Sequence, residues 1–243
     1  MSQIDKKKRF WDNYFRLYSL SMLGNEKIMS RVDSYSSIDN FYEKNYVLAN
    51  MPEKYLDFEV DTIEGQLCKT KENIAEIEKV KSYLDSIDVA FEKGIGLYLS
   101  GSHGVGKSSI AVIILKKALR KYYSCFFCRS TEIVDFAMSG WRNDDKKTFW
   151  DYVTNCDFMV VDDIARAFDV SKYERIHIDS IFTKRDSAGL PTIVTANHSV
   201  DDNREIFGEA LYSNFKERLI QLNILGEDYR GVIGKTLLDE LKK

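Results

Sequence analysis

Apolar and polar residues alternate with two different periods along this chain, beginning near residue 71. Four short, almost wholly apolar runs predict strands buried on both faces, at 97–99, 125–128, 158–161 and 192–195. Helical spacing predicts a charged amphipathic helix over 71–93, an apolar helix over 110–119, and a helix that opens at Ser171 with Glu174 completing a capping box. The apolar face of the first helix would carry Ile74, Ile77, Val80, Tyr83 and Leu84. Buried strands that alternate with helices indicate an α/β fold, a parallel sheet covered by helices on both sides.

Aromatic side chains on a polar background characterise the first 47 residues. Phe10, Tyr14 and either Leu17 or Tyr18 recur at helical spacing, which predicts at least one amphipathic helix. This stripe either covers the surface of the main domain or belongs to a small module that docks a partner. We favour the module, and we place a helical N-terminal module over 1–47 and the main domain over 48–243.

Composition limits the classes of protein that this chain can belong to. Its 243 residues correspond to one core plus an appendage, at about 150 residues per domain. An apolar content of 44% excludes wholesale disorder, and a net charge of −3 offers no global attraction to nucleic acid. No apolar run reaches the roughly 18 residues of a membrane span, and no secretion signal is apparent. Four scattered cysteines do not form a disulfide framework, so we expect a reduced, cytoplasmic protein without membrane contact.

The segment GSHGVGKS at 101–108 matches the phosphate-loop pattern G-x-x-x-x-G-K-[ST] in full and lies between a predicted strand and a predicted helix. Its amide groups and the following helix N-terminus would converge on phosphate oxygens. We expect Lys107 to reach the β- and γ-phosphates of ATP and the Ser108 hydroxyl to hold Mg²⁺. The residues expected to bind the nucleotide are Gly101, Ser102, His103, Gly104, Val105, Gly106, Lys107, Ser108 and Ser109.

Two acids, Asp162 and Asp163, directly follow the apolar run 158–161. Asp162 would complete the magnesium site, and Asp163 would orient and deprotonate the attacking water. Asn197 ends the next strand and would bind the γ-phosphate or that water, although an ordinary strand-ending Asn is a competing interpretation. Arg218, on a helix further along, either caps a surface or reaches a neighbouring subunit's nucleotide as an arginine finger.

These motifs together resemble the AAA+ ATPases, and among them the DnaC/DnaI-type replicative helicase loaders and their IstB relatives. The resemblance runs from about residue 49 to residue 231 and includes the phosphate loop. Its other segments are MPEKY at 51–55, VVDDI at 160–164, TAN at 195–197, FKERL at 215–219 and GEDYRG at 226–231. It implies a P-loop NTPase (AAA+/ASCE) parallel five-stranded sheet without a full C-terminal lid. It also implies that Asp162 and Asp163 are Walker B acids, Asn197 is sensor 1, and Arg218 is the finger.

The resemblance implies several partners as well. The N-terminal part of such loaders binds the hexameric helicase; some relatives carry zinc there, but 1–67 contains no Cys or His, so we expect no zinc. Cys125 and Cys128 would face opposite sides of a strand, which favours core cysteines over a metal or redox site. The long segment between the second and third strands would line a channel for single-stranded DNA, or else form an outer helix. Its expected DNA contacts are Arg129, Arg142, Lys146 and Lys147.

The function that this resemblance implies is an ATP-dependent helicase loader of bacterial or bacteriophage DNA replication, a slow ATPase stimulated by oligomerisation or single-stranded DNA. ATP would join protomers head to tail in a ring or spiral, and hydrolysis would release the loader. Two alternatives remain: an IstB-like transposition ATPase, and a non-hydrolysing, nucleotide-gated DNA-binding adaptor.

Overall fold

The computed structural model describes residues 49–55, 58–61, 71–138, 143–164, 172–226 and 228. The proposed module over 1–47 lies outside this range, and so do Ser171 and most of the segment after Gly226. None of the helices in the described part combines the length and apolarity needed to cross a bilayer.

Five parallel strands form a single sheet in the order β2-β3-β4-β1-β5. They are β1 (Gly96–Ser100), β2 (Cys125–Arg129), β3 (Phe158–Asp162), β4 (Thr192–Thr195) and β5 (Leu219–Asn223). The four apolar runs of the sequence pattern are confirmed as strands β1 to β4, and the five-stranded α/β fold is confirmed with them. Because all strands are parallel, their carboxyl ends meet at one edge of the sheet.

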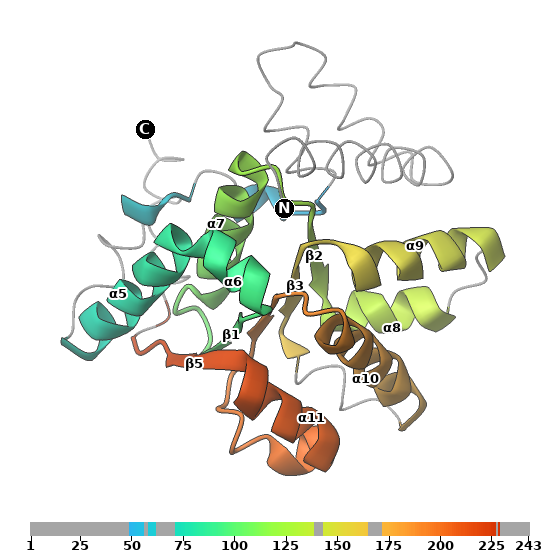
Figure 1. The fold of residues 1–243 in the computed structure, drawn as a ribbon. Helices are drawn as coiled ribbons and strands as arrows, with labels where there is room; N and C mark the ends of the chain where they lie inside the picture. Colours follow the sequence, from blue (N-terminus) through green and yellow to red (C-terminus); the bar gives the residue numbers. More distant parts are fainter. Residues whose placement is uncertain are drawn as a thin grey trace, which may run out of the picture.

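Helices cover both faces of the sheet, as Figure 1 shows. On one side lie α5 (Lys71–Asp85), α6 (Ile87–Lys93) and α7 (Lys107–Arg120). On the other lie α8 (Ser130–Met138), α9 (Asn143–Asn155), α10 (Lys172–Ser187) and α11 (Arg204–Arg218). A 3-10 turn, η2 (Glu53–Tyr55), precedes α5. Helices α8 and α9 come between β2 and β3 in the chain, and in space they extend from the β2 side of the sheet.

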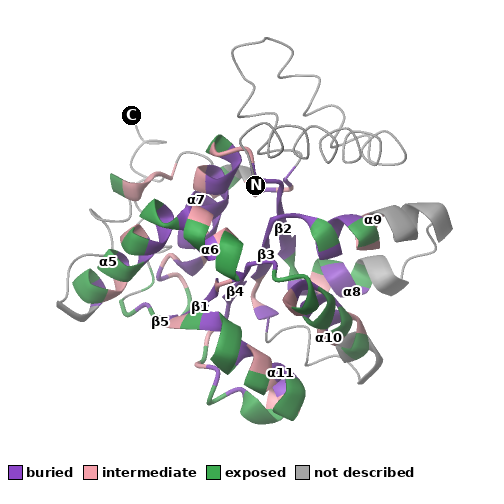
Figure 2. Ribbon diagram, in the orientation of Figure 1, coloured by how far each residue is buried: buried purple, intermediate pink, exposed green. Residues whose placement is uncertain are grey.

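Two hydrophobic cores, one on each face, hold the layers together. Successive strand residues alternate between them: Leu97 and Leu99 pack with α5, α6 and α7, whereas Tyr98 packs with α10 and α11. β1 and β4 are buried along their whole length, and many exposed positions lie on the outer surfaces of the helices (Figure 2). Cys125 and Cys128 belong to opposite cores, which confirms the interpretation that they are core cysteines; both are buried and free.

The structure corrects two expectations about the elements. The predicted helix over 71–93 is divided at Ser86 into α5 and α6, and Ile74, expected on its apolar face, is 41% exposed. The sequence pattern assigned no residues to the fifth strand. That strand is β5, which begins at Leu219, directly after α11, and occupies the sheet edge with Ile220 exposed.

Candidate functional site

The phosphate loop connects β1 to α7, and its backbone conformation depends on glycine. Gly101, Gly104 and Gly106 all have positive φ, at 145°, 74° and 95°, which side chains disfavour. A Cβ at Gly101 would collide with the carbonyl oxygen of Ile224, and a Cβ at Gly104 would collide with the carboxylate of Asp228. The loop therefore packs closely against the segment after β5. Helix α7 begins at Lys107, so its free amide groups point into the loop.

Lys107 is held inside the loop, only 8% exposed. Its ammonium donates to the carbonyl oxygens of Gly101 and Ser102, both at 2.7 Å, and to the Asn197 side-chain oxygen at 3.2 Å. These contacts fix a single positive charge at the mouth of the loop. They also place Asn197, from the end of β4, beside the phosphate lysine.

A chain of hydrogen bonds connects the start of α7 to the start of α8. Ser108 Oγ and Thr195 Oγ1 both donate to Asp162 Oδ1, each at 2.7 Å. The Asp163 amide donates to Thr195 Oγ1 at 2.9 Å, and its carbonyl accepts from Ser130 Oγ at 2.7 Å. With both backbone groups held, Asp163 adopts a φ of 56°, in the left-handed region that non-glycine residues rarely occupy.

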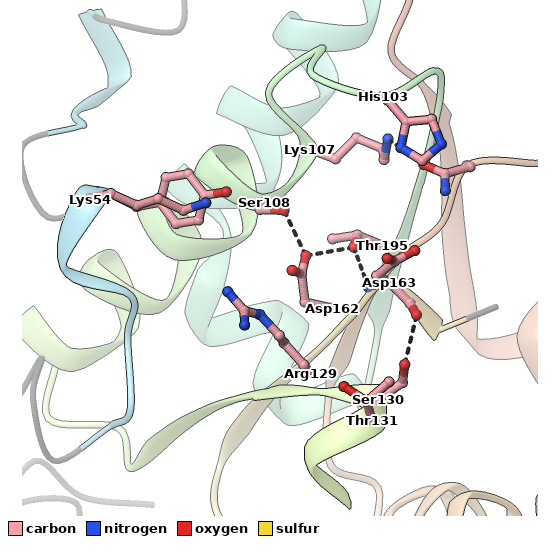
Figure 3. A pocket seen from close by; sticks show the side chains of 12 residues that line it. Lys54, His103, Lys107, Ser108, Arg129, Ser130, Thr131, Asp162, Asp163 and Thr195 are labelled. Carbon is pink, nitrogen blue, oxygen red and sulfur yellow. Dashed lines mark hydrogen bonds between the residues drawn. The ribbon is translucent and has the colours of Figure 1, made fainter. Parts of the chain in front are cut away.

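These side chains surround a cavity of about 330 Å³ at the carboxyl end of the sheet (Figure 3). Its walls come from the phosphate loop, the ends of β2, β3 and β4, the start of α8, and η2. The residues that line it are Lys54, Tyr55, His103, Lys107, Ser108, Arg129, Ser130, Thr131, Asp162, Asp163, Thr195 and Asn197. The paired oxygens of Ser108 and Asp162 are the donor type that Mg²⁺ prefers, so these two residues fit a magnesium ion.

The structure brings together most of the residues singled out from the sequence. Of the loop residues, Val105 is fully buried and Ser109 lies inside α7, so these two support the loop from within. Arg218 lies elsewhere: it ends α11 and its Nε is 2.9 Å from Asp186 Oδ1. Arg129, for which we expect a DNA contact, also lines this cavity. Arg142 lies outside the described residues. Lys146 and Lys147 lie on α9, and only the backbone of these two residues is described.

Sequence reasoning missed the position of Thr195 as the link between the two acids. The TAN motif at 195–197 was an available signal, because it places a hydroxyl at the carboxyl end of a parallel strand, the same sheet edge at which the two acids lie. It also missed Lys54 and Tyr55 as cavity residues; the Lys54 ammonium lies 4.6 Å from the centre of the Tyr55 ring. Only the fold brings this turn, some fifty residues before the loop, to the same cavity.

A parallel sheet in this strand order, with a phosphate loop after β1, two acids after β3 and an amide after β4, defines a P-loop NTPase of the AAA+ type. The sequence profile described as "IstB-like ATP binding protein" matches residues 72–231, well over half of the chain. The chain therefore belongs to the IstB-like ATP-binding protein family, whose DnaC-type AAA+ members it also resembles.

Individual relatives agree with this assignment. The chain is 24% identical over 142 residues to the replicative helicase loader DnaC of Escherichia coli (strain K12), covering 58% of this chain and 56% of that protein. It thus spans just over half the length of this curated relative. Its fold is similar to the crystal structure of the DnaC helicase loader (TM-score 0.62, 24% identity, 71% of this chain and 99% of that one). It is also similar to the replication initiator DnaA bound to AMPPCP and single-stranded DNA (TM-score 0.58, 17% identity, 79% of this chain and 56% of that one).

Proposed function

We propose that the protein binds and hydrolyses ATP and uses this cycle as an assembly and release switch when it loads a replicative helicase onto single-stranded DNA. The observation that carries the proposal is the cavity in which the phosphate loop, Asp162, Asp163 and Asn197 meet. The relationship to a replicative helicase loader supports the biological role.

Each residue has a defined chemical task in this proposal. Lys107 binds the β- and γ-phosphates by exchanging its loop carbonyls for phosphate oxygens. Ser108 and Asp162 hold Mg²⁺, which neutralises phosphate charge when bound. Asp163 orients the attacking water and accepts its proton, and Asn197 positions that water or the terminal phosphate. The strained backbone of Asp163 supports this role. Hydrogen bonds hold both its amide and its carbonyl, and they fix the backbone position from which the carboxylate side chain extends.

Arg218 acts on a neighbouring protomer's nucleotide in this proposal. Leu219 pairs with Gly96 at the start of β1, whereas the phosphate loop follows Ser100 at its end. Four residues of strand separate these points by roughly 13 Å along the sheet, so Arg218 lies away from its own cavity. Its side chain is 43% exposed, and it would exchange Asp186 for phosphate in a head-to-tail ring or spiral.

Two further segments carry the proposed partners. The module over 1–47 binds the hexameric helicase. The α8–α9 pair contacts single-stranded DNA through Arg142, Lys146 and Lys147, which lie in or next to α9, and aromatic side chains such as Trp150 accompany them. The DNA-bound DnaA neighbour supports DNA contact as a property that this fold can carry.

Mixing two inactive variants tests the shared site. Lys107→Ala lacks its own nucleotide site but keeps its finger, and Arg218→Ala lacks the finger but keeps the site. We expect each alone to hydrolyse ATP at a background rate and their mixture to recover part of the wild-type rate, measured as phosphate release. A mixture as inactive as its components would contradict a finger in trans. Full activity of Arg218→Ala alone would assign the finger to another residue.

Co-purification tests the biological role. With a non-hydrolysable ATP analogue, the full chain should retain a hexameric replicative helicase, and the chain without residues 1–47 should bind the analogue but lose the helicase. The IstB-like profile supports a second candidate, a transposition ATPase. A transposition ATPase would instead assemble on duplex DNA with ATP and would not bind the helicase. Nucleotide binding without any turnover that depends on Lys107 or Asp163 would indicate a non-hydrolysing adaptor.

A further inference from the structure

Arg129 occupies a position that neither the phosphate loop nor the Walker acids explain. It is the last residue of β2, and the strand register places it directly opposite Asp162 on β3. It lines the same cavity as Lys107 and Ser108. In Figure 3 its guanidinium extends into the cavity, with Asp162 between it and Lys107.

The guanidinium of Arg129 is free, which sets it apart from the other arginines with described side chains. Arg120 pairs with Glu59, Arg204 with Glu209 and Arg218 with Asp186. Arg185 is buried and donates to several backbone carbonyls. Within the described part of the chain, the Arg129 side chain forms neither an ion pair nor a hydrogen bond, and it is exposed to the cavity.

The backbone that carries Arg129 is nevertheless fixed. Its amide donates to the Glu132 carboxylate at 2.9 Å, a contact within the first turn of α8. The next residue, Ser130, is bonded to the carbonyl of Asp163. The base of the side chain is therefore tied to the acid turn, while its charged end remains available.

A bound triphosphate would need positive charge on both sides of the cavity. Lys107 provides it from the phosphate loop, but Asp162 and Asp163 contribute negative charge on the opposite wall. Arg129 is the cavity cation beside these acids, and a guanidinium binds phosphate oxygens through two parallel hydrogen bonds. We infer that Arg129 binds the terminal phosphate of ATP within its own protomer and so distinguishes ATP from ADP. This inference rests on the proposed nucleotide site and adds a second cation, from β2, to it.

The test compares equilibrium affinities of the full chain for a non-hydrolysable ATP analogue and for ADP, both with Mg²⁺. Losing a charge-assisted contact that only ATP makes should weaken analogue binding of Arg129→Ala by about 10- to 100-fold and leave ADP binding unchanged. Arg129→Lys should recover part of the lost affinity, because lysine keeps the positive charge but cannot form the two parallel hydrogen bonds of a guanidinium. Arg204→Ala, which removes an exposed arginine on α11, should bind both nucleotides like the wild type.

Unchanged ADP affinity shows that the variant site is folded, so the comparison is internally controlled. The inference is overturned if Arg129→Ala binds the analogue as tightly as the wild type, or if both affinities fall equally. It is also overturned if nucleotide binding is unchanged and affinity for single-stranded DNA falls instead, which would make Arg129 a DNA contact. Failure of the wild type to bind either nucleotide would overturn the proposed function itself, a result distinct from these.

Discussion

Two clusters of polar side chains lie at opposite ends of the same parallel strands, and they use buried charge for different purposes. At the carboxyl ends, Lys107 and Asp162 face an open cavity of about 330 Å³. At the amino ends, Arg185 and Asp157 are 1% and 2% exposed. Similar residue types therefore serve a ligand at one end and the fold at the other.

The amino-end cluster is buried, and its charged groups are held by hydrogen bonds from the protein itself. Arg185 donates to the carbonyl oxygens of Cys156 and Pro191, at 2.8 and 2.7 Å, and to Thr192 Oγ1 at 2.9 Å. Asp157 Oδ2 accepts from both the amide and the hydroxyl of Ser124, each at 2.8 Å. The loops before β2, β3 and β4 are joined in this way. At the carboxyl end, the Lys107 ammonium is instead bound by loop carbonyl oxygens, which a phosphate can replace.

The largest expected effect is on stability, from Arg185→Met. The variant leaves buried carbonyl oxygens without donors, and each such loss costs about 1–3 kcal/mol. We expect the free energy of unfolding to fall by about 3 kcal/mol or more, measured by urea denaturation followed by circular dichroism. Arg204→Met, at an exposed ion pair, should leave the unfolding midpoint unchanged. Wild-type stability of Arg185→Met would contradict the assignment of this cluster to the fold.

Asp162→Asn should separate ligand binding from stability. Asparagine fills the same space but removes the charge that would hold Mg²⁺, so we expect about 10-fold weaker binding of the ATP analogue in Mg²⁺. With the metal chelated, the variant and the wild type should bind equally. Asp157→Asn is the matched control at the other end: it should lower the unfolding midpoint and leave the affinity of the folded protein unchanged. Reversed outcomes for the two variants would refute the comparison.

Thr195→Val sharpens the comparison at a smaller scale. It removes the hydroxyl that accepts from the Asp163 amide and donates to Asp162. A lost hydrogen bond at a buried amide should cost about 1–2 kcal/mol of stability, together with a lower rate of phosphate release because Asp163 loses its tether. Thr195→Ser keeps the hydroxyl and should restore both properties. Equal rates for the Val and Ser variants would show that the tether does not matter for turnover.

The smallest expected effect lies outside both clusters, at Glu59. Partial burial acts to raise the pKa of Glu59, but hydrogen bonds from Arg120 and Lys116 outweigh it and hold that pKa below its ordinary 4.5. A lowered folded-state pKa stabilises the protein above pH 4.5, and this contribution disappears as pH falls through the folded pKa. Glu59→Gln should therefore unfold slightly more easily at pH 7 and like the wild type near pH 3. A difference that grows on acidification would contradict this account.

The sequence predicted those parts of the structure whose signal is local. The four apolar strands are contiguous patterns, and each was confirmed. The phosphate-loop segment is contiguous as well, and it lies between a strand and a helix as predicted. The division at Ser86 is slight, and the sequence pattern did not predict it. Helical hydrogen bonds still span this residue: the Ser86 amide donates to the Ser82 carbonyl, and the Ser86 carbonyl accepts from the Ala90 amide. β5 was missed because it follows α11 without a turn, and because only Leu219 and Leu222 of this strand are buried, so that it lacks a wholly apolar run.

Three residues of the cavity, Arg129, Lys54 and Tyr55, could not be assigned to it from any local pattern. That Arg129 lies opposite Asp162 follows from the order and register of β2 and β3, which the sequence does not state. From the sequence, Arg129 is a basic residue at the start of the segment expected to bind DNA, and its DNA contact stays a prediction. Lys54 and Tyr55 reach the cavity for the same kind of reason, because the segment before α5 folds back beside β2.

Calorimetric titration with a non-hydrolysable ATP analogue and Mg²⁺ tests the central claim most directly, on the wild type and Lys107→Ala side by side. The wild type should show saturable heat with one site per chain. The variant, without the ammonium that the loop holds, should show none at the same concentrations. Equal affinity in the two proteins would contradict the assignment of this cavity to ATP.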